Sequence, residues 1–229
     1  YSGKKQKPEL GGLPLDVPAF AKWIAEHRLV EFIFEENPHS ELIKRSACIL
    51  LVLGQEAERL PPPLVQLVWS CCSPEKHEDI VRATFELIAE LATSLPPGLL
   101  EAFFANIRAV PPSQYDEKTI AFLKDYTMNA IANLKRARKH AESGKMRGSG
   151  VGGMFRGGGK KAEGPLYEDD RYYSPQIFWD IACDNSTTVR CKELALSALI
   201  DALRAASAIG PDCKDAFVEL GLKNIQEGH

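Results

Sequence analysis

Residues 71–79 bring together side chains that perform chemistry in many enzymes. Two adjacent cysteines, a histidine and two carboxylates occur there, namely Cys71, Cys72, His77, Glu78 and Asp79. A thiol with a histidine as general base, and a carboxylate that orients the base, is the arrangement of a nucleophilic cysteine. Cysteine, histidine and carboxylate are also the ligand types of zinc sites. This segment is therefore the first candidate for an active site or a metal site.

The order of these residues favours a packed helix over an active site. Ser73 is a good N-cap for a helix that starts at Pro74, because serine accepts from free backbone N–H groups and proline fits the first turn. Glu75, Glu78 and Asp79 then lie near the positive end of the helix dipole. On this helix Glu78 and Asp79 face outward, whereas the two cysteines end the preceding helix. We interpret the stretch as a helix that packs.

Motifs for metals and cofactors are absent from the sequence. His77 has no second histidine four residues away, and no Cys-x-x-Cys pair occurs. The chain also lacks a GxxxxGK[ST] motif, a GxGxxG motif that follows a strand, and a GxSxG motif. We therefore expect no catalytic residue, no metal and no cofactor, and we expect this segment not to be an enzyme.

The overall composition is that of a soluble globular protein. Apolar residues make up 45% and charged residues 26% of the 229 residues, and the formal net charge is −3. This balance gives no overall reason to expect nucleic acid or a membrane surface as a partner. The longest apolar run, residues 47–54, is far shorter than the roughly 20 residues that span a bilayer.

The cysteines and the first residue indicate the cellular context. Six cysteines occur, and four of them lie inside apolar helical patterns. We interpret them as small core residues of a protein in a reducing compartment, and expect an intracellular, cytoplasmic location with the nucleus as the second option. Because the chain begins with Tyr1 and carries no signal-peptide pattern, we expect a segment of a longer protein.

Helical patterns separated by proline and glycine follow one another along the chain. No sustained alternation of polar and apolar residues indicates a strand. We predict helices at residues 16–27, 28–36, 40–54, 62–72, 74–92, 96–110, 116–140, 174–184, 187–207 and 211–225.

Two of these helices have apolar faces that are too wide for a surface helix. The apolar residues of 74–92 cover an arc of roughly 200°, and the charged residues of 189–204 fill a stripe only roughly 80° wide. An ordinary surface helix needs an apolar arc of little more than about 100°. Both helices therefore require neighbours on two sides, and we expect Ile80, Leu87 and Leu199 to be covered.

Stacked helix pairs supply such neighbours, because each inner helix contacts its own partner and the adjacent repeats. Short helices joined by turns that contain proline are typical of these repeats. We predict an all-α fold, an armadillo- or HEAT-like α-solenoid of about nine or ten helices with one long Gly-rich basic insertion. No repeat is visible at a strict period, so an irregular helical bundle is the alternative.

The helical pattern is interrupted once. We divide the chain into a flexible lead-in (1–15), a helical repeat region (16–140), an insertion (141–173) and a continuation of the helical repeats (174–226). The insertion is first rich in glycine and basic, then acidic and aromatic. It cannot bury enough apolar surface to offset its backbone entropy, so we expect it to be disordered.

Positive charge is concentrated in residues 135–161. Nine Lys or Arg face one acid, Glu142, which gives a local charge of +8 in a chain of −3. One interpretation is a tether for nucleic acid or another polyanion, with Phe155 available to stack on a base. The other is an insertion that is basic only to stay solvated. The candidate polyanion contacts are Lys135, Arg136, Arg138, Lys139, Lys145, Arg147, Arg156, Lys160 and Lys161.

The sequence YEDDRYY, residues 167–173, follows the basic stretch directly. Its acidic and aromatic side chains suit three roles: they fold back on the basic stretch, they bind a peptide, or they are phosphorylated. One sequence leaves all three open.

Several segments resemble the long N-terminal helical region of the very large ubiquitin carboxyl-terminal hydrolases of the fat-facets type. Residues 19–34 are similar to that family's Trp-Ile helix and the short apolar helix after it. Residues 67–92 carry the most specific match: a tryptophan, then Lys-His-Glu, then Ile-Val at the start of a long amphipathic helix. The similarity continues through 96–107 and, more loosely, at 177–203. It does not include the glycine-rich insertion.

The resemblance implies an armadillo-like scaffold that lies outside the protease domain. The family's catalytic cysteine and histidine boxes have no counterpart here, so no catalytic residue is carried over. The parent protein is expected to be a cysteine-type deubiquitinase, a thiol-dependent ubiquitin hydrolase. This segment is expected to be a non-catalytic scaffold that binds protein partners or substrates of the ubiquitin pathway. The alternative function is nucleic-acid binding through residues 135–161.

Overall fold

The structure, a computed structural model, describes residues 16–36, 38–55, 60–146 and 171–206, together with 218–219, 222–223 and 226. These residues form helices and turns, and no strand occurs among them. In chain order the elements are α1 (Val17–Glu26), α2 (Leu29–Glu31), the π-helix η1 (Phe32–Glu36), α3 (Ser40–Arg45), α4 (Ala47–Gln55), α5 (Pro62–Ser70), α6 (Glu78–Leu91), α7 (Pro97–Arg108), the 3-10 helix η3 (Pro112–Gln114), α8 (Glu117–Met146), α9 (Pro175–Cys183) and α10 (Val189–Ala206).

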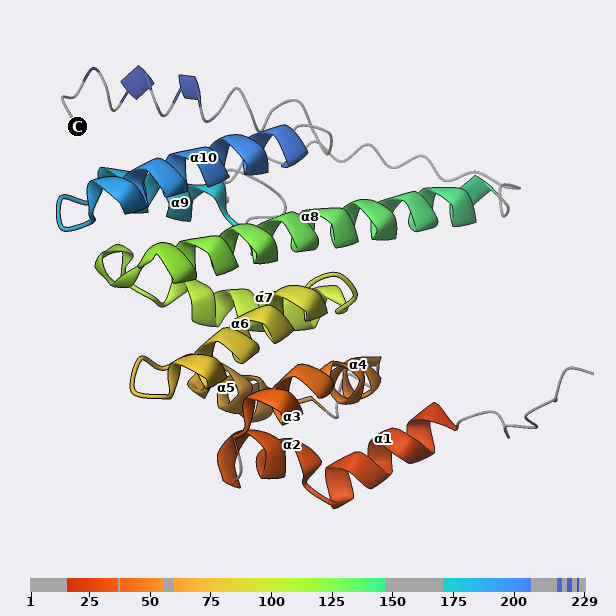
Figure 1. Ribbon diagram of the computed structural model, residues 1–229. Coiled ribbons are helices and arrows are strands. Elements are labelled where there is room, and N and C mark those ends of the chain that lie inside the picture. The colour runs from red at the N-terminus through yellow and green to blue at the C-terminus, as the bar shows by residue number, and fades with distance from the viewer. Residues whose placement is uncertain are drawn as a thin grey trace, which may run out of the picture.

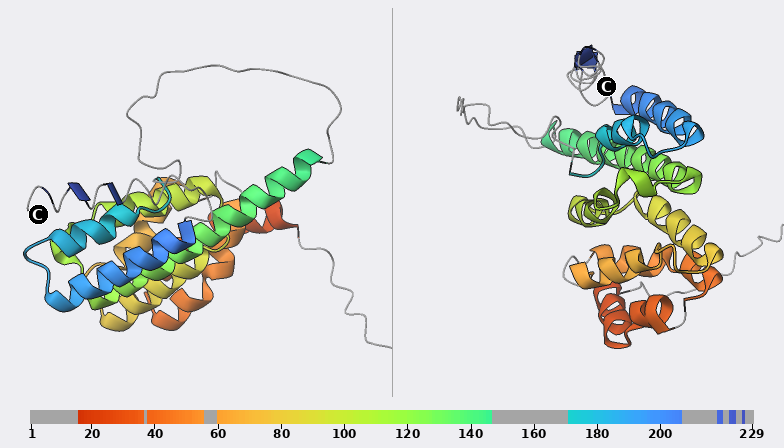
Figure 2. Two further views of the ribbon diagram at one scale, coloured as in Figure 1. Left: turned by 90° about the horizontal axis from the view of Figure 1, so that it is seen from above. Right: turned by 90° about the vertical axis from the view of Figure 1, so that its left-hand side faces the viewer.

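The helices stack in two columns, seen from the side in Figure 1 and in the right-hand view of Figure 2, and along the stack in the left-hand view of Figure 2. The even column contains α4, α6, α8 and α10, and the odd column contains α5, α7 and α9. Within the even column α6 contacts α4 and α8, and α8 contacts α10. Within the odd column α5 contacts α7, and α9 contacts η3, which follows α7. The predicted all-α, armadillo-like solenoid is therefore confirmed, with ten α-helices in the described residues.

The two ends of the stack are formed by different elements. α1 and α2 lie at one end, where α1 packs on α4 and α2 packs on α5. α10 lies at the other end and packs on both α8 and α9. Among the described residues, no helix combines the length and the apolar character that a membrane crossing requires.

The odd-column helices share one type of beginning. Each has a proline in its first turn: Pro62 in α5, Pro97 in α7 and Pro175 in α9. Proline fixes a helical φ and lacks an N–H, and the first turn of a helix has no use for that N–H. Consequently these helices begin where the sequence predicts, within one residue.

Three of the four even-column helices, α6, α8 and α10, begin with a polar side chain that accepts a backbone N–H. His77 Nδ1 accepts from Asp79 N (3.2 Å) at α6, and Asp116 Oδ1 accepts from Thr119 N (2.8 Å) at α8. At α10, Thr188 Oγ1 accepts from Cys191 N (3.3 Å). Such caps satisfy donors that have no partner inside the helix.

The predicted start of the helix at 74–92 is wrong by four residues. α6 begins at Glu78, and His77 is its N-cap instead of Ser73. Ser73 closes a turn between α5 and α6: its Oγ accepts from Glu75 N (3.4 Å), and its carbonyl accepts from Lys76 N (3.0 Å). Residues 73–76 therefore complete their hydrogen bonds locally and do not extend the helix.

The single helix predicted for residues 40–54 is two helices. The break falls at Ser46, which is 1% exposed. Its hydroxyl donates to the carbonyl of Ile43 (2.7 Å), and its backbone N–H donates to the same carbonyl (3.1 Å). Serine side chains compete with the helix for carbonyl oxygens in this way, and α3 ends there.

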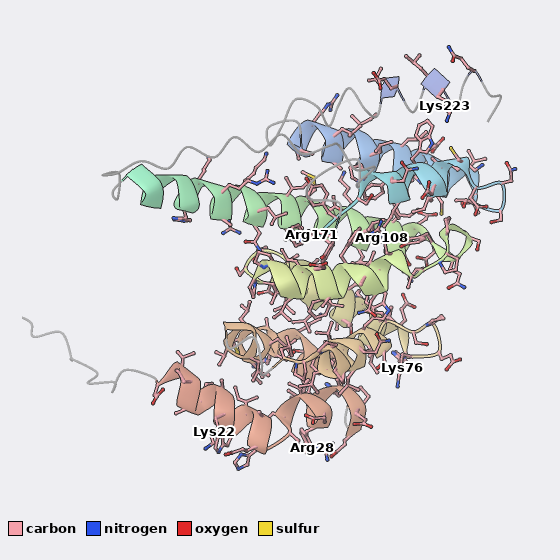
Figure 3. The ribbon with its side chains drawn as sticks, turned by 180° about the vertical axis from the view of Figure 1, so that it is seen from behind. Lys22, Arg28, Lys76, Arg108, Arg171 and Lys223 are labelled. Carbon is pink, nitrogen blue, oxygen red and sulfur yellow. The ribbon has the colours of Figure 1, made fainter. Side chains whose placement is uncertain are left out.

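Residues at both ends of the predicted insertion, 141–173, are part of the folded structure. α8 continues to Met146, six residues past the predicted end at 140, and projects beyond its neighbours (Figure 1). At the other boundary Tyr172 and Tyr173 are buried, and the guanidinium of Arg171 lies 4.8 Å from the Tyr172 ring centre (Figure 3). Residues 141–146 and 171–173 thus belong to the fold.

Other predicted segments lie outside the described residues. These are the lead-in 1–15, residues 147–170 of the predicted insertion, and nearly all of the predicted helix 211–225. Their predictions stand as predictions.

The core lies between the columns and follows the predicted apolar faces. Leu87 of α6 and Leu199 of α10 are 1% and 5% exposed, as expected for helices with neighbours on two sides. Ile80 is only half-buried, because it lies in the first turn of α6 at the edge of the stack. Phe103 and Phe104 of α7 and Tyr126 of α8 are fully buried between the columns.

Candidate protein-binding groove

A groove of about 900 Å³ runs between α6 and α8 in the even column. The last turn of α5, the turn that leads to α6 and the connection between α7 and α8 all border it near the N-terminal ends of α6 and α8. Its lining residues are Trp69, Ser70, Cys72, Ser73, Pro74, Glu78, Val81, Arg82, Phe85, Glu86, Ala89, Val110, Gln114, Asp116, Lys118, Thr119, Ala121, Phe122 and Asp125.

The floor of the groove is aromatic. Phe85 and Phe122 are stacked with ring centres 4.3 Å apart, and Trp69 lies 6.3 Å from Phe122. Phe122 is also 6.2 Å from Tyr126, which stacks on Phe104, so the floor continues directly into the core. These rings are held in place by each other before any ligand binds. Binding of a ligand over them therefore costs little conformational entropy of the ring side chains.

Helical periodicity puts the lining side chains on one face of each helix. Val81, Phe85 and Ala89 are four residues apart on α6, and Lys118, Phe122 and Asp125 recur at four and three residues on α8. Positions with these spacings share one face of a helix. The groove is therefore the seam between two facing stripes, and the packing of α6 on α8 sets its width.

One wall of the groove is joined by an ion pair between the two helices. Lys118 Nζ of α8 lies 2.5 Å from Glu78 Oε1 of α6. The hydrogen bond from Lys118 lowers the pKa of Glu78, and Glu78 raises the pKa of Lys118 for the same reason. On α6 itself, Arg82 pairs with Asp79 (2.5 Å). Both cations of the groove are thus neutralised by carboxylates of this chain.

Two carboxylates of the groove have no such cation. Asp116 accepts from the backbone N–H and the hydroxyl of Thr119, and so caps α8. Asp125 is exposed and has no hydrogen bond or ion pair to any residue that the structure describes. The formal charge of the lining is −2, from Glu78, Glu86, Asp116 and Asp125 against Arg82 and Lys118.

The ion pair in the groove is one of a series along the even column. Lys44 of α3 pairs with Glu86 of α6 (3.5 Å). Lys124 of α8 pairs with Asp201 of α10 (2.6 Å), and Arg190 of α10 approaches Glu117 of α8 (3.9 Å). Each junction α3–α6, α6–α8 and α8–α10 is therefore crossed by opposite charges.

The cysteines that opened the sequence analysis are not placed for catalysis. Cys71 is 0% exposed and its thiol donates to the carbonyl of Phe34 (3.3 Å). Burial raises the pKa of Cys71 and raises that of Cys72 well above its usual value. A thiol with a raised pKa is a poor nucleophile at neutral pH. The structure supports the interpretation of this segment as packing and capping.

His77 caps the N-terminus of α6 and does not act as the base of a cysteine thiol. Its side chain is 73% exposed, and its Nδ1 faces the backbone N–H of Asp79. Within the described residues, no group of three or more histidines, cysteines or carboxylates has a geometry that would hold a metal ion.

Only some of the predicted polyanion contacts lie in the part of the chain that the structure describes. Lys135, Arg136, Arg138 and Lys139 lie on the C-terminal half of α8. The side chain of Lys145 and the residues Arg147, Arg156, Lys160 and Lys161 lie outside what the structure describes.

Arg136 has a structural contact, because its guanidinium donates to the carbonyl of Thr93 beyond the end of α6. Asn133 nearby donates to the carbonyls of Ala92 (3.0 Å) and Leu95 (2.8 Å). These side chains of α8 satisfy carbonyls at the end of α6, which has no glycine cap. Part of the predicted basic cluster therefore stabilises the junction between two repeats.

The groove itself was not predicted from the sequence. One signal was present: Phe85 lies at the edge of the apolar arc of α6, beside Glu78 and Arg82. A large aromatic residue at such an edge is half-covered by the neighbouring helix. Its partner Phe122 lies 37 positions further along the chain, since 122 − 85 = 37. Only the packing of α6 on α8 brings the two rings together.

Comparisons with known proteins agree with the fold. Residues 7–119 match the family described as "UBP24/USP9X/USP9Y ARM repeat". Ubiquitin carboxyl-terminal hydrolase 34 of Homo sapiens is 30% identical over 119 residues, and that of Mus musculus is 29% identical over 119 residues. The aligned part is 52% of this chain but only 3% of each relative. No solved structure matches the chain significantly.

The family match covers α1 to α7 and the first residues of α8. It includes the α6 side of the groove, whereas Phe122 and Asp125 follow the matched range. The similarity noted for residues 177–203 also lies beyond the match.

Proposed function

Because residues 7–119 match the family described as "UBP24/USP9X/USP9Y ARM repeat", we propose that the chain is a non-catalytic scaffold segment of a large deubiquitinase. In this proposal it binds a protein partner or substrate of the ubiquitin pathway in the groove between α6 and α8. The aligned relatives are named ubiquitin carboxyl-terminal hydrolases, and the chain spans 3% of their length. The thiol-dependent hydrolysis expected of the parent would reside in another part of the protein.

The aromatic floor of the groove carries the proposal. Trp69, Phe85 and Phe122 form a contiguous ring surface, and charged residues surround it. Protein interfaces concentrate their binding energy in such aromatic centres enclosed by polar rims. Repeat solenoids bind their partners along extended surfaces of this kind.

A groove-filling substitution tests the binding site. Ala121 of α8 lines the groove and is exposed, so Ala121→Trp adds bulk inside it without removing a core contact. Ala132→Trp is the matched control, because Ala132 is exposed on the same helix and does not line the groove. Peptides selected from a random phage-displayed library on the full chain should bind the control and lose at least about tenfold in affinity for Ala121→Trp.

Equal binding of the selected peptides to both tryptophan variants would place the binding surface elsewhere and contradict the groove. Circular dichroism of the two variants serves as the check that both keep the helical fold.

The non-catalytic part of the proposal has its own assay. Ubiquitin-amidomethylcoumarin incubated with the chain should release no fluorophore, because burial raises the pKa of both Cys71 and Cys72. Turnover that disappears in Cys71→Ala or Cys72→Ala would overturn it. The free cysteines also favour an intracellular, cytoplasmic location.

A second candidate function is nucleic-acid binding through residues 135–161, favoured by their local charge of +8. This binding would weaken steeply with salt, because each neutralised phosphate releases counterions. Deletion of residues 141–165 should abolish it. Nucleic-acid binding that survives the deletion unchanged, or no binding at low salt, would eliminate this candidate.

A further inference from the structure

We propose that the groove takes a polypeptide segment that carries a large apolar side chain flanked by Lys or Arg. This inference rests on the proposed function, which assigns protein binding to the groove. It adds the chemical character of the bound segment. The apolar floor of the groove indicates the apolar side chain, and the charges of the rim indicate the flanking Lys or Arg.

The floor requires an apolar anchor. Phe122 is buried, whereas Trp69 and Phe85 are half-buried. The exposed parts of Trp69 and Phe85 are therefore the ring surface that a ligand would contact. Val81 and Ala89 extend this surface along α6. A polar side chain here would lose its hydration without a partner, whereas a Leu, Met, Phe or Trp side chain would bury apolar area.

The rim requires positive charge. The two cations of the lining are already paired, Lys118 with Glu78 and Arg82 with Asp79. An acidic ligand would compete with Glu78 and Asp79 for these cations and would be repelled by both carboxylates. Asp125, in contrast, is a carboxylate without a partner among the described residues, one turn from Phe122 on the same face of α8. An incoming ammonium or guanidinium would pair with it at no cost to an existing contact.

Asp116 adds to the same effect at the other end of the groove. Its printed hydrogen bonds go to Thr119, and it has no cation within salt-bridge distance among the described residues. The excess of two negative charges in the lining therefore lies at the two ends of the aromatic floor. A segment with cations on both sides of one apolar anchor matches this order of charge, apolar surface and charge.

The test uses two synthetic peptides on the full chain. Both contain one central tryptophan and one leucine, and they differ only in whether lysines or glutamates flank that pair. The fluorescein-labelled peptides are titrated at low salt and followed by fluorescence anisotropy. The lysine peptide should bind at least about tenfold more tightly than the glutamate peptide, and its affinity should fall with added NaCl.

Charge reversal locates the effect. Asp125→Lys should weaken the lysine peptide by about five- to tenfold and should leave the fold intact, because Asp125 is exposed and has no partner in the described part of the chain. Glu101→Lys is the matched control: Glu101 is exposed on α7, outside the groove, and the substitution changes the net charge equally. It should leave the affinity within about twofold.

Three results of the peptide titrations would overturn the inference. They are a glutamate peptide that binds as tightly as the lysine peptide, equal weakening by Asp125→Lys and Glu101→Lys, and no binding of the lysine peptide at all. In each case the proposed function would still hold if Ala121→Trp weakens the binding of library-selected peptides. The groove would then bind a protein ligand of different chemistry. Tighter binding after deletion of residues 147–165 would show that the chain's own basic stretch occupies the groove, and this would overturn a partner segment as the occupant.

Discussion

The even and odd columns of the solenoid are built by different sequence rules. Odd-column helices begin with proline and are short, with 9, 12 and 9 residues in α5, α7 and α9. In the even column α6, α8 and α10 begin after a polar cap and have 14, 30 and 18 residues. From α5 to α10, the residue at a helix start therefore indicates which column the helix joins. The long capped helices leave faces for binding that the short ones lack.

The columns also differ in what joins consecutive helices. Opposite charges cross the α3–α6, α6–α8 and α8–α10 junctions, all on the even side. Both columns supply fully buried apolar side chains to the shared core. Those of the odd column with at most 1% exposure are Val65, Val68, Leu100, Phe103, Phe104, Ile107, Phe178 and Ile181. Because exposed ion pairs contribute little and buried apolar area contributes much, stability should depend on the core and not on the charges.

The largest effect is expected from the odd column. Phe103→Ala removes a ring that is 0% exposed and should lower the free energy of unfolding by about 3–5 kcal/mol. Phe32→Ala, at a ring that is 45% exposed, is the control and should cost less than about 1 kcal/mol. Urea denaturation followed by circular dichroism measures both. Similar losses for the two variants would contradict the placement of the core between the columns.

A hydrogen bond between the columns should have the next largest effect. The buried hydroxyl of Tyr126 on α8 lies 3.0 Å from the carbonyl of Leu100 on α7 and 3.2 Å from that of Tyr172, which precedes α9. Burial also raises the pKa of Tyr126, so the hydroxyl stays protonated and donates. Tyr126→Phe leaves these buried carbonyls without this donor and should cost about 1–2 kcal/mol by the same denaturation. An unchanged midpoint would mean that water replaces the hydroxyl.

At the next residue of α8, removal of a buried hydroxyl is expected to stabilise the chain. Thr127 is 0% exposed, and its hydroxyl has no hydrogen-bond partner among the residues that the structure describes. Thr127→Val replaces an unsatisfied hydroxyl by a methyl group of similar size and should stabilise the chain by about 1 kcal/mol. A loss of stability would show that the threonine hydroxyl has a partner, such as a buried water. Tyr126 and Thr127 together compare a paired and an unpaired buried hydroxyl at one level of the stack.

The smallest effect is expected from the charges of the even column. Lys118→Met breaks the exposed pair with Glu78 and should lower the thermal midpoint slightly at low salt and not at high salt. The lowered pKa of Glu78 sets the pH dependence: the pair stabilises the fold above the unfolded-state pKa of Glu78, and the stabilisation is lost as the pH falls through the lowered pKa. The difference between wild type and Lys118→Met should therefore vanish in acid.

The helices were predictable because local signals define them. Proline in the first turn gave the starts of α5, α7 and α9, and the wide apolar arcs required the stacking that the structure confirms. Two boundaries were wrong where side chains compete locally with the helix, at Ser46, which ends α3, and at Ser73, which closes the turn before α6. A sequence window contains both serines but does not say which hydrogen bond prevails.

The groove was beyond reach of the sequence for a different reason. It depends on the contact between Phe85 and Phe122, and on the absence of a partner for Asp125 among the described residues, which is a property of the packed surface. Periodicity identifies each face of α6 and α8 by itself. It does not identify which faces meet or how far apart they stay.

Hydrogen–deuterium exchange on the chain, with and without a library-selected peptide, tests the difference between the columns most directly. The account predicts slower exchange on peptide binding in residues 78–89 and 117–125, the groove faces of α6 and α8, and no change in α7 or α9. Protection confined to α7 and α9 would contradict the assignment of binding to the even column.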